Sequence, residues 1–193
     1  MSTATLCLLL LGLILPSAGD TSQDQPVHVV PSVDLSRYAG RWYEMARFPN
    51  RFQKSCAGDV TATYKVLDNG DIEVVNRCRK DDGEWMEANG IARRLSEEEP
   101  TSKLQVRFAP AWLSFLPFVW GDYWVIDLAE DYSFALVGDP GREFLWVLAR
   151  TPSLDDSTYA RLMETAQREG FDTTRVVRTS HSRGTGKNDR GFD

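Results

Sequence analysis

The sequence predicts an all-β protein, an eight-stranded antiparallel up-and-down β-barrel with one C-terminal α-helix packed against its outside. Three features support this fold class. Short runs of β-branched and aromatic residues follow one another between Gly40 and Arg150, turn signals separate them, and one helical pattern comes after them. Sequential strands with little helix between them indicate an antiparallel meander, and closing the meander removes exposed edges and leaves room for one small ligand. A flat sandwich is the structural alternative.

Eight strands are expected at hairpin spacing. They span residues 40–48, 60–67, 71–79, 85–94, 103–108, 123–128, 132–137 and 144–150. The dipeptide Asn69-Gly70 gives the strongest turn signal, because Asn-Gly favours tight hairpin turns. Residues 103–108, KLQVRF, alternate strictly between polar and apolar side chains, as a strand with one buried face does.

One amphipathic helix is expected after the last strand. Ser153 is the expected N-cap, Asp156 completes a variant of the capping box, and Gly170 supplies the stop. Apolar side chains recur at helical spacing at Tyr159, Leu162, Met163 and Ala166. The helix would lie against the outside of the barrel, and residues 174–179, TRVVRT, would form a short closing strand.

Both ends of the chain differ in composition from the centre. Residues 8–15, LLLLGLIL, are too few to span a membrane and precede small residues, so residues 1–19 are expected to be a cleaved signal peptide. Cys7 comes before most of the apolar run, unlike a lipobox cysteine, so a soluble rather than lipid-anchored protein is expected. The polar, Gly-rich residues 182–193 are expected to form a disordered tail.

The net charge and the positions of the histidines limit the classes of function to be expected. The formal net charge of −6 argues against a nucleic-acid partner, because no basic face is available to neutralise phosphates. Neither His28 nor His181 falls on an expected strand, and no catalytic triad, phosphate loop or metal-ligand spacing is visible. We therefore expect a binding protein rather than an enzyme, with no metal and no cofactor. Axial haem ligation in particular would need an interior histidine.

Two cysteines remain once the signal peptide is removed. Cys56 and Cys78 make an even number in an oxidising compartment and are expected to form a disulfide. The expected hairpin register places Thr61 rather than Cys56 opposite Cys78. The chain before Val60 must therefore bend over to bring the sulfurs together.

Three motifs carry a resemblance to a known family. Gly40-Arg41-Trp42 opens the first strand as a G-x-W motif, residues 130–132 read EDY, and Arg150 ends the last strand before the helix. Over residues 33–181 the chain resembles the lipocalins, in particular the bacterial outer-membrane-associated lipocalins and apolipoprotein D. Glu130 stands where that family usually has Thr, and the spacing onward to Phe134 is one residue shorter than in apolipoprotein D.

The resemblance implies structural roles for Gly40, Trp42 and Arg150. In lipocalins the signature Trp closes the bottom of the barrel, and the signature Arg lies over its ring. Such a cation–π contact is worth roughly 0.5–2 kcal/mol. If Trp42 closes one end, the other end is the mouth.

The alternation of side chains, started from Trp42 and Arg150 and aligned to the family, predicts the cavity wall. The expected ligand-binding residues are Phe52, Tyr64, Ile72, Val74, Asn76, Met86, Phe108, Tyr123, Phe134, Leu136 and Trp146. Ala46 and Phe48 are also expected to face inward. A closed, filled core is the alternative, but small residues such as Ala88 and Gly90 do not fill a barrel and favour a cavity.

Two further features are expected at the cavity. Glu44 would face inward and either orient a ligand head group or, as we favour, accept hydrogen bonds from nearby Tyr or Arg side chains. The segment from Ala109 to Gly121, APAWLSFLPFVWG, is aromatic and uncharged and is expected at the mouth. It would make transient contact with a membrane, or else pack on the barrel or form a homodimer contact.

The resemblance implies a small lipid ligand and a role outside the cytoplasm. Fatty acids, lysophospholipids or similar amphiphiles would be carried or stored in the periplasm, or at the outer-membrane periphery of a Gram-negative bacterium, in envelope lipid maintenance. The alternative is a lipocalin-fold enzyme that isomerises or reduces a bound lipid, with Glu44 or Tyr123 as acid or base.

Overall fold

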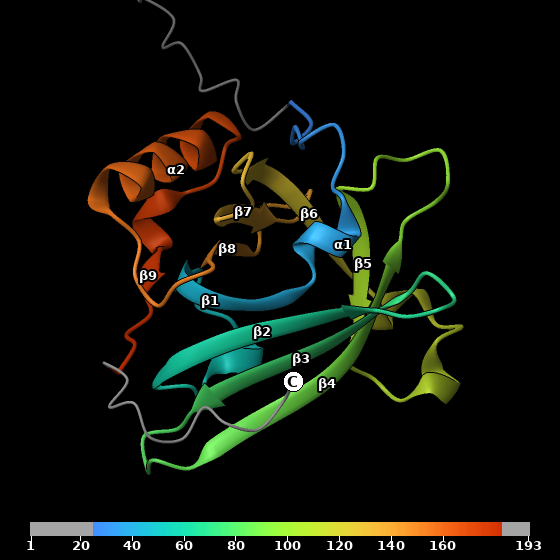
Figure 1. The fold of residues 1–193 in the computed structure, drawn as a ribbon, viewed down its shortest axis with the longest axis horizontal. Coiled ribbons are helices and arrows are strands. Elements are labelled where there is room, and N and C mark those ends of the chain that lie inside the picture. The colour runs from blue at the N-terminus through green and yellow to red at the C-terminus, as the bar shows by residue number, and fades with distance from the viewer. Residues whose placement is uncertain (1–24, 183–193) are drawn as a thin grey trace, which may run out of the picture.

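The computed structural model describes residues 25–182 of the chain (Figure 1). The predicted signal peptide, residues 1–19, lies outside the described residues, and so do residues 183–193 of the predicted tail. Ser182, the first residue of that tail, is held in place, because its backbone N–H donates to the Asp59 carboxylate at 2.6 Å and its hydroxyl at 2.8 Å.

All the predicted barrel strands are present. They are β1 (Gly40–Arg47), β2 (Gly58–Val66), β3 (Ile72–Arg79), β4 (Trp85–Arg94), β5 (Lys103–Arg107), β6 (Gly121–Leu128), β7 (Phe134–Gly138) and β8 (Leu145–Ala149). Each pairs antiparallel with the next, and pairing of β1 with both β2 and β8 closes the barrel. The short strand β9 (Val177–Arg178) adds to β1 from outside. The predicted fold class is confirmed, and the predicted closing strand is shorter than expected because the 3₁₀ helix η5 (Thr173–Arg175) occupies its start.

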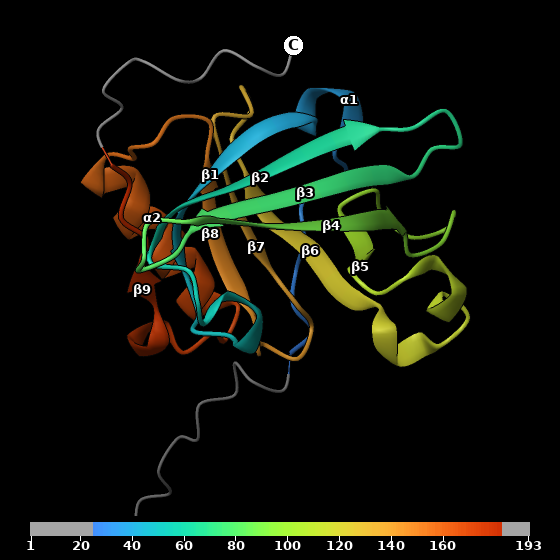
Figure 2. The same ribbon diagram turned by 90° about the horizontal axis from the view of Figure 1, so that it is seen from below.

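Because successive strands alternate in direction, four strand connections lie at one end of the barrel and three at the other. The β2–β3 turn includes Gly70 with φ of 86°, a conformation that Gly adopts without a steric penalty. The long connection between β5 and β6 lies at the opposite end and extends away from the sheet (Figure 2). The connection between β1 and β2, which contains the 3₁₀ helix η2 (Arg51–Gln53), lies at that same end.

The helices differ from the prediction in two respects. Helix α2 (Asp156–Arg168) has Asp155 rather than Ser153 as its N-cap, because the Asp155 carboxylate accepts from the Thr158 N–H at 2.8 Å and carries a negative charge at the helix N-terminus. The short helix α1 (Leu35–Tyr38), capped by Asp34, was not predicted. In residues 25–182 no helix combines the length and the apolar character needed to cross a bilayer.

The apolar side chains form two clusters on the two faces of the sheet. Helix α2 lies beside the barrel (Figure 1), and the outer cluster lies between it and strands β1, β7 and β8. Leu162 and Ala166 of the helix are fully buried in this cluster. The inner cluster surrounds Trp42 and includes Ile72, Val74 and Leu104. The sheet therefore has a packed outer face under the helix and an inner face toward the cavity.

The predicted facing of four residues is wrong. On β1 the register shifts between Glu44 and Ala46, so that Ala46 and Phe48 belong to the outer cluster. Such a β-bulge interrupts the in–out alternation of a strand. On β7, Phe134 and Leu136 were expected to face the cavity but pack in the outer cluster. Leu136 lies opposite Val147 of β8, and directly opposed residues share a face of the sheet.

Candidate ligand cavity

The barrel contains a cavity of about 1310 Å³ that opens between the η2 segment and the β5–β6 connection. Most of the predicted ligand-binding residues border it: Phe52, Tyr64, Ile72, Val74, Asn76, Met86, Phe108, Tyr123 and Trp146. Phe134 and Leu136 do not, because they face α2. The wall is mainly apolar, and the Asn76 Oδ1 atom is buried without a hydrogen-bond partner among residues 25–182. Contact of these residues with a ligand stays a prediction.

Small residues on β4 leave the space that the cavity occupies. Ala88 and Ala92 border the cavity. Gly90 has a different role, because a Cβ atom there would lie 2.7 Å from the Phe108 ring. Phe108 therefore lies against the backbone of β4, at a position where a larger residue would displace it.

Trp42 and Arg150 close the floor of the barrel. The Arg150 guanidinium carbon lies 3.9 Å from the centre of the Trp42 ring, and Trp42 is fully buried. The indole N–H donates to the Tyr38 carbonyl at 2.8 Å, and Arg150 donates to the Arg37 carbonyl at 2.6 Å. Since these carbonyls belong to α1, the short helix is fixed across the closed end.

Three tyrosine hydroxyls meet above this floor. The hydroxyl oxygens of Tyr38 and Tyr123 lie 2.8 Å apart, and those of Tyr64 and Tyr123 lie 3.0 Å apart. Burial raises the pKa of Tyr64 to about 12 and holds the pKa values of Tyr38 and Tyr123 well above their usual range. All three groups are neutral at physiological pH. Sequence reasoning missed Tyr38, although Asp34 before α1 is a recognisable N-cap signal.

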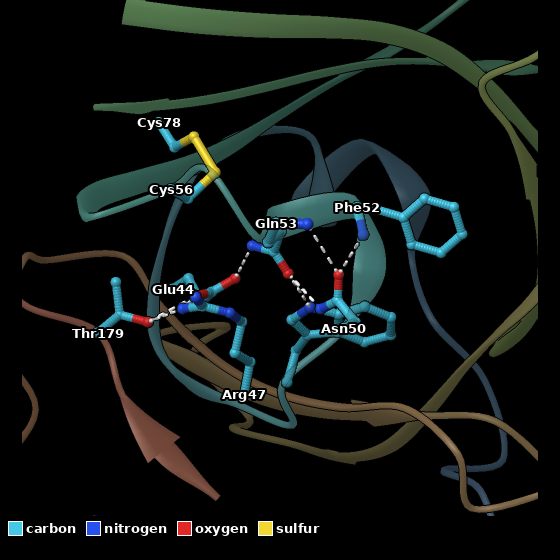
Figure 3. The surroundings of a disulfide bond; sticks show 9 residues. Glu44, Arg47, Asn50, Phe52, Gln53, Cys56, Cys78 and Thr179 are labelled. Atoms are coloured by element: carbon cyan, nitrogen blue, oxygen red, sulfur yellow. Dashed lines mark hydrogen bonds and ion pairs between the residues drawn. A yellow bond between two sulfur atoms is a disulfide. The ribbon is translucent and has the colours of Figure 1, made fainter. Parts of the chain in front are cut away.

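Glu44 is buried and its carboxylate is fully engaged. One oxygen accepts from Arg47 at 2.9 Å and from Thr179 at 2.5 Å, and the other accepts from Gln53 at 2.6 Å. Figure 3 shows this arrangement, in which the Gln53 side chain extends from η2 to the neighbouring Glu44 carboxylate. The favoured prediction for Glu44 is confirmed, with Arg47 as its charged partner. The same carboxylate fixes η2 at the mouth.

The disulfide between Cys56 and Cys78 is present, with a Cα–Cα distance of 5.6 Å, and it joins the η2 connection to β3 (Figure 3). The predicted pairing is confirmed. The predicted register is wrong by one residue, because Thr61 lies opposite Arg77. The reason is the turn, which pairs Val66 with Ile72, and the chain before Thr61 then bends at a register shift to bring Cys56 to Cys78.

The β5–β6 connection presents aromatic side chains to solvent. The exposed fractions are 72% for Trp112, 74% for Phe115 and 81% for Phe118. Trp120 is held differently, because Arg93 and Arg107 lie over its ring at 3.9 and 5.1 Å. These three exposed side chains do not pack on the barrel, and Phe118 borders the mouth of the cavity.

The two histidines lie away from the cavity wall. His28 is exposed beside Glu169, with 3.2 Å between the ring Nδ1 and a carboxylate oxygen. The Nε2 atom of His181 lies 2.8 Å from the Glu44 carbonyl oxygen. In the described part of the chain, no group of three or more His, Cys, Asp or Glu side chains is arranged to hold a metal ion.

Comparison with known proteins agrees with this architecture. Residues 33–181 match the family described as Lipocalin-like domain. The chain is 38% identical over 162 residues to temperature-induced lipocalin-1 of Arabidopsis thaliana, which covers 83% of this chain and 86% of that protein. It is 39% identical over 152 residues to outer membrane lipoprotein Blc of Escherichia coli K12, with coverages of 78% and 81%. Identity to apolipoprotein D of Mus musculus is 32% over 162 residues, with 80% of each chain covered.

Solved structures share the fold at lower sequence identity. Insecticyanin from the tobacco hornworm Manduca sexta aligns with a TM-score of 0.63 at 19% identity, over 82% of this chain and 86% of that chain. Lobster apocrustacyanin A1 aligns with a TM-score of 0.62 at 18% identity, over 82% and 93% of the two chains. The closed barrel, the helix outside it and the family match over residues 33–181 agree, and the chain belongs to the lipocalin family.

Proposed function

We propose that this protein binds small amphiphilic lipids, such as fatty acids or lysophospholipids, in the barrel and carries or stores them. The observation that carries the proposal is a cavity of about 1310 Å³ with a largely apolar wall and a few polar groups. Sites for small apolar ligands are usually built this way. Lipocalins bind small hydrophobic ligands, so family membership supports the same use of this cavity.

An envelope location and a role in lipid maintenance are also part of the proposal. The relatives from Citrobacter freundii, Escherichia coli and Vibrio cholerae are named outer membrane lipoproteins. Together with the signal-peptide pattern of residues 1–19, this leads us to propose export to the periplasm or the outer-membrane periphery of a Gram-negative bacterium. The position of Cys7 before the apolar run favours a soluble form over a lipid-anchored one.

The aromatic connection at the mouth would bring the cavity to its lipid source. Trp112, Phe115 and Phe118 are exposed on a segment that carries no charge, and aromatic side chains partition into membrane interfaces. Because Phe118 also borders the cavity, contact with a bilayer would place the opening at the membrane surface. A lipid could then enter with little exposure of its acyl chain to water.

Catalysis forms no part of the proposal. An isomerase or reductase would need Glu44 or Tyr123 as acid or base. The Glu44 carboxylate accepts from Arg47, Thr179 and Gln53. The Tyr123 hydroxyl lies against two other hydroxyls, and its pKa is raised, so neither group is placed as a free base toward a substrate.

Native mass spectrometry of protein purified from its exported compartment tests the binding function. Wild type should carry an acyl-chain adduct, and Val74→Trp should lose it because the indole would occupy the cavity. Val75→Trp is the matched control, since the neighbouring residue on β3 does not border the cavity. A wild-type protein that is bare, and that takes up neither added fatty acid nor lysophospholipid, would refute lipid carriage.

A further inference from the structure

The tyrosine cluster at the cavity floor has hydrogen-bonding capacity that the protein does not use. Its three hydroxyls, on Tyr38, Tyr64 and Tyr123, carry three hydrogens, whereas two hydrogen bonds link them. Among residues 25–182 one of these hydrogens therefore lacks an acceptor. Each hydroxyl oxygen can also accept more than one hydrogen bond. The cluster can both donate to and accept from a further group.

The surroundings of the cluster make an unused donor costly. Ile72, Val74 and Leu104 are buried around the same end of the cavity. A polar group in an apolar environment loses its hydrogen bonds with water, and a new hydrogen-bond partner compensates for that loss. A ligand whose buried end carries an oxygen atom would supply such a partner, and a plain hydrocarbon end would not.

The charges near the floor favour a neutral oxygen over a carboxylate. Arg150 is the cation below the floor, but its guanidinium donates to the carbonyls of Arg37 and Arg41 and lies over Trp42. Arg150 does not border the cavity, so it offers no direct partner to a buried anion. An ionised carboxylate on the floor would have phenol donors alone, and burying a charge without a counter-charge is expensive.

The charged end of a ligand has a better place at the mouth. Arg51 and Arg175 border the cavity and are exposed, and Asp122 and Glu143 border it as well. Floor and mouth are well separated, because Ile72 and Cys78 on β3 both border the cavity and lie roughly 20 Å apart at about 3.3 Å per residue. A long chain can therefore place one end at the tyrosines and the other among the charged groups.

We propose that the Tyr38–Tyr64–Tyr123 cluster is a subsite for a neutral oxygen, a hydroxyl or a carbonyl, at the buried end of the cargo. This inference rests on the proposed lipid-binding function and narrows it. The preferred ligand is a long-chain amphiphile with a charged group at one end and a neutral oxygen function at the other.

Isothermal titration calorimetry with two acids of matched shape tests the subsite. ω-Hydroxypalmitic acid and heptadecanoic acid differ in one terminal group, hydroxyl in the first and methyl in the second. Wild type should bind the hydroxy acid at least as tightly as the methyl analogue. In the variant Tyr38→Phe/Tyr64→Phe/Tyr123→Phe, which keeps the rings and removes the hydroxyls, the ratio of the two dissociation constants should shift about tenfold against the hydroxy acid.

Controls separate the subsite from general effects on the barrel. Tyr43→Phe/Tyr159→Phe removes hydroxyls from residues that pack with the outer cluster, and its ratio should match wild type. Circular dichroism checks that each variant is folded. If the triple variant does not fold, the ratio of the two dissociation constants in wild type still tests the proposal. Binding of the hydroxy acid that is tenfold or more weaker than that of the methyl analogue would contradict it.

Two further outcomes overturn the inference while leaving lipid binding intact. An unchanged ratio in the triple variant would mean that the tyrosines do not contact the chain end. Equal weakening of both acids would mean that the carboxylate, and not the neutral end, lies at the floor. If wild type binds neither acid, lipid carriage itself fails, and the subsite fails with it.

Discussion

Glu44 is an acidic residue on the inner face of an apolar barrel, and its partners explain why it is tolerated there. The carboxylate accepts hydrogen bonds from Arg47, Thr179 and Gln53, which come from β1, the C-terminal segment and η2. A buried charge is stable when it is paired and hydrogen-bonded. Glu44 thereby ties the neighbouring segments β1 and η2 to the C-terminal segment at Thr179.

We predict that Glu44→Gln lowers the free energy of unfolding by about 3 kcal/mol, because Arg47 would lose its buried counter-charge. Urea denaturation followed by tryptophan fluorescence measures the change. Glu73→Gln, the same substitution at an exposed site on β3, should stay within about 0.5 kcal/mol of wild type. Equal stability of Glu44→Gln and wild type would show that the network contributes little.

At the scale of single elements, α2 depends on the charge of its N-cap. The Asp155 carboxylate accepts from Ser157 and from the Thr158 N–H, and these bonds lower its pKa from 3.8 to about 2. Because the pKa is lower in the folded state, the stabilisation is fully present above the unfolded pKa. It is lost as pH falls from about 4 toward 2.

Asp155→Asn should therefore be less stable than wild type at neutral pH, and the difference should shrink as the solution is acidified through this range. Chemical denaturation at a series of pH values, with helix content followed by circular dichroism, measures it. Asp68→Asn in the exposed β2–β3 turn is the control, since Asp68 caps no helix. A difference that does not vary with pH would contradict the assignment of Asp155 as a charged cap.

The disulfide acts on another element, the η2 segment at the mouth. Cys56 and Cys78 are separated by 22 residues, and cross-links over loops of this size contribute about 3 kcal/mol in the chain-entropy account. Cys56→Ser/Cys78→Ser should lose about that much stability. Denaturation with and without reductant measures it. Reductant should destabilise wild type and leave the double variant unchanged, and an unaffected wild type would contradict the prediction.

At the scale of the whole molecule, the exposed aromatic residues within the described range 25–182 belong to the open end of the barrel. We predict that wild type floats with liposomes of outer-membrane lipid composition, and that Trp112→Ser/Phe115→Ser floats several-fold less. The matched control is Val66→Ser, which removes an exposed apolar side chain at the closed end. Equal flotation of the loop variant and wild type would exclude membrane contact, and loss of a dimer in that variant would instead identify a homodimer contact.

The order of elements followed from local pattern. Turn residues such as Asn69-Gly70 and the alternation in residues 103–108 depend on neighbours in the sequence, so the strands could be placed without knowledge of the fold. The same holds for the amphipathic helix. The disulfide followed from the count of cysteines, since two remain when the predicted signal peptide is set aside.

The direction in which side chains face could not be predicted so well. One bulge on β1 turned Ala46 and Phe48 outward, and the register between β7 and β8 turned Phe134 and Leu136 toward α2. Alternation assumes an unbroken pleat, and nothing local in the sequence reports a bulge. Most of the predicted wall residues nevertheless border the cavity. Those on β2, β3 and β4 do so because these strands pair without a register shift beyond Thr61.

The tyrosine cluster could not be predicted from local sequence pattern. Tyr38, Tyr64 and Tyr123 come from α1, β2 and β6, and their hydroxyls meet because barrel closure brings these segments to one point. Sequence pattern identified two of them as separate wall residues and did not identify the third. Strands and turns are determined largely by residues that are close in the sequence. A shared hydrogen-bonding site depends on long-range packing, so in this protein only the closure of the barrel decided which tyrosines meet.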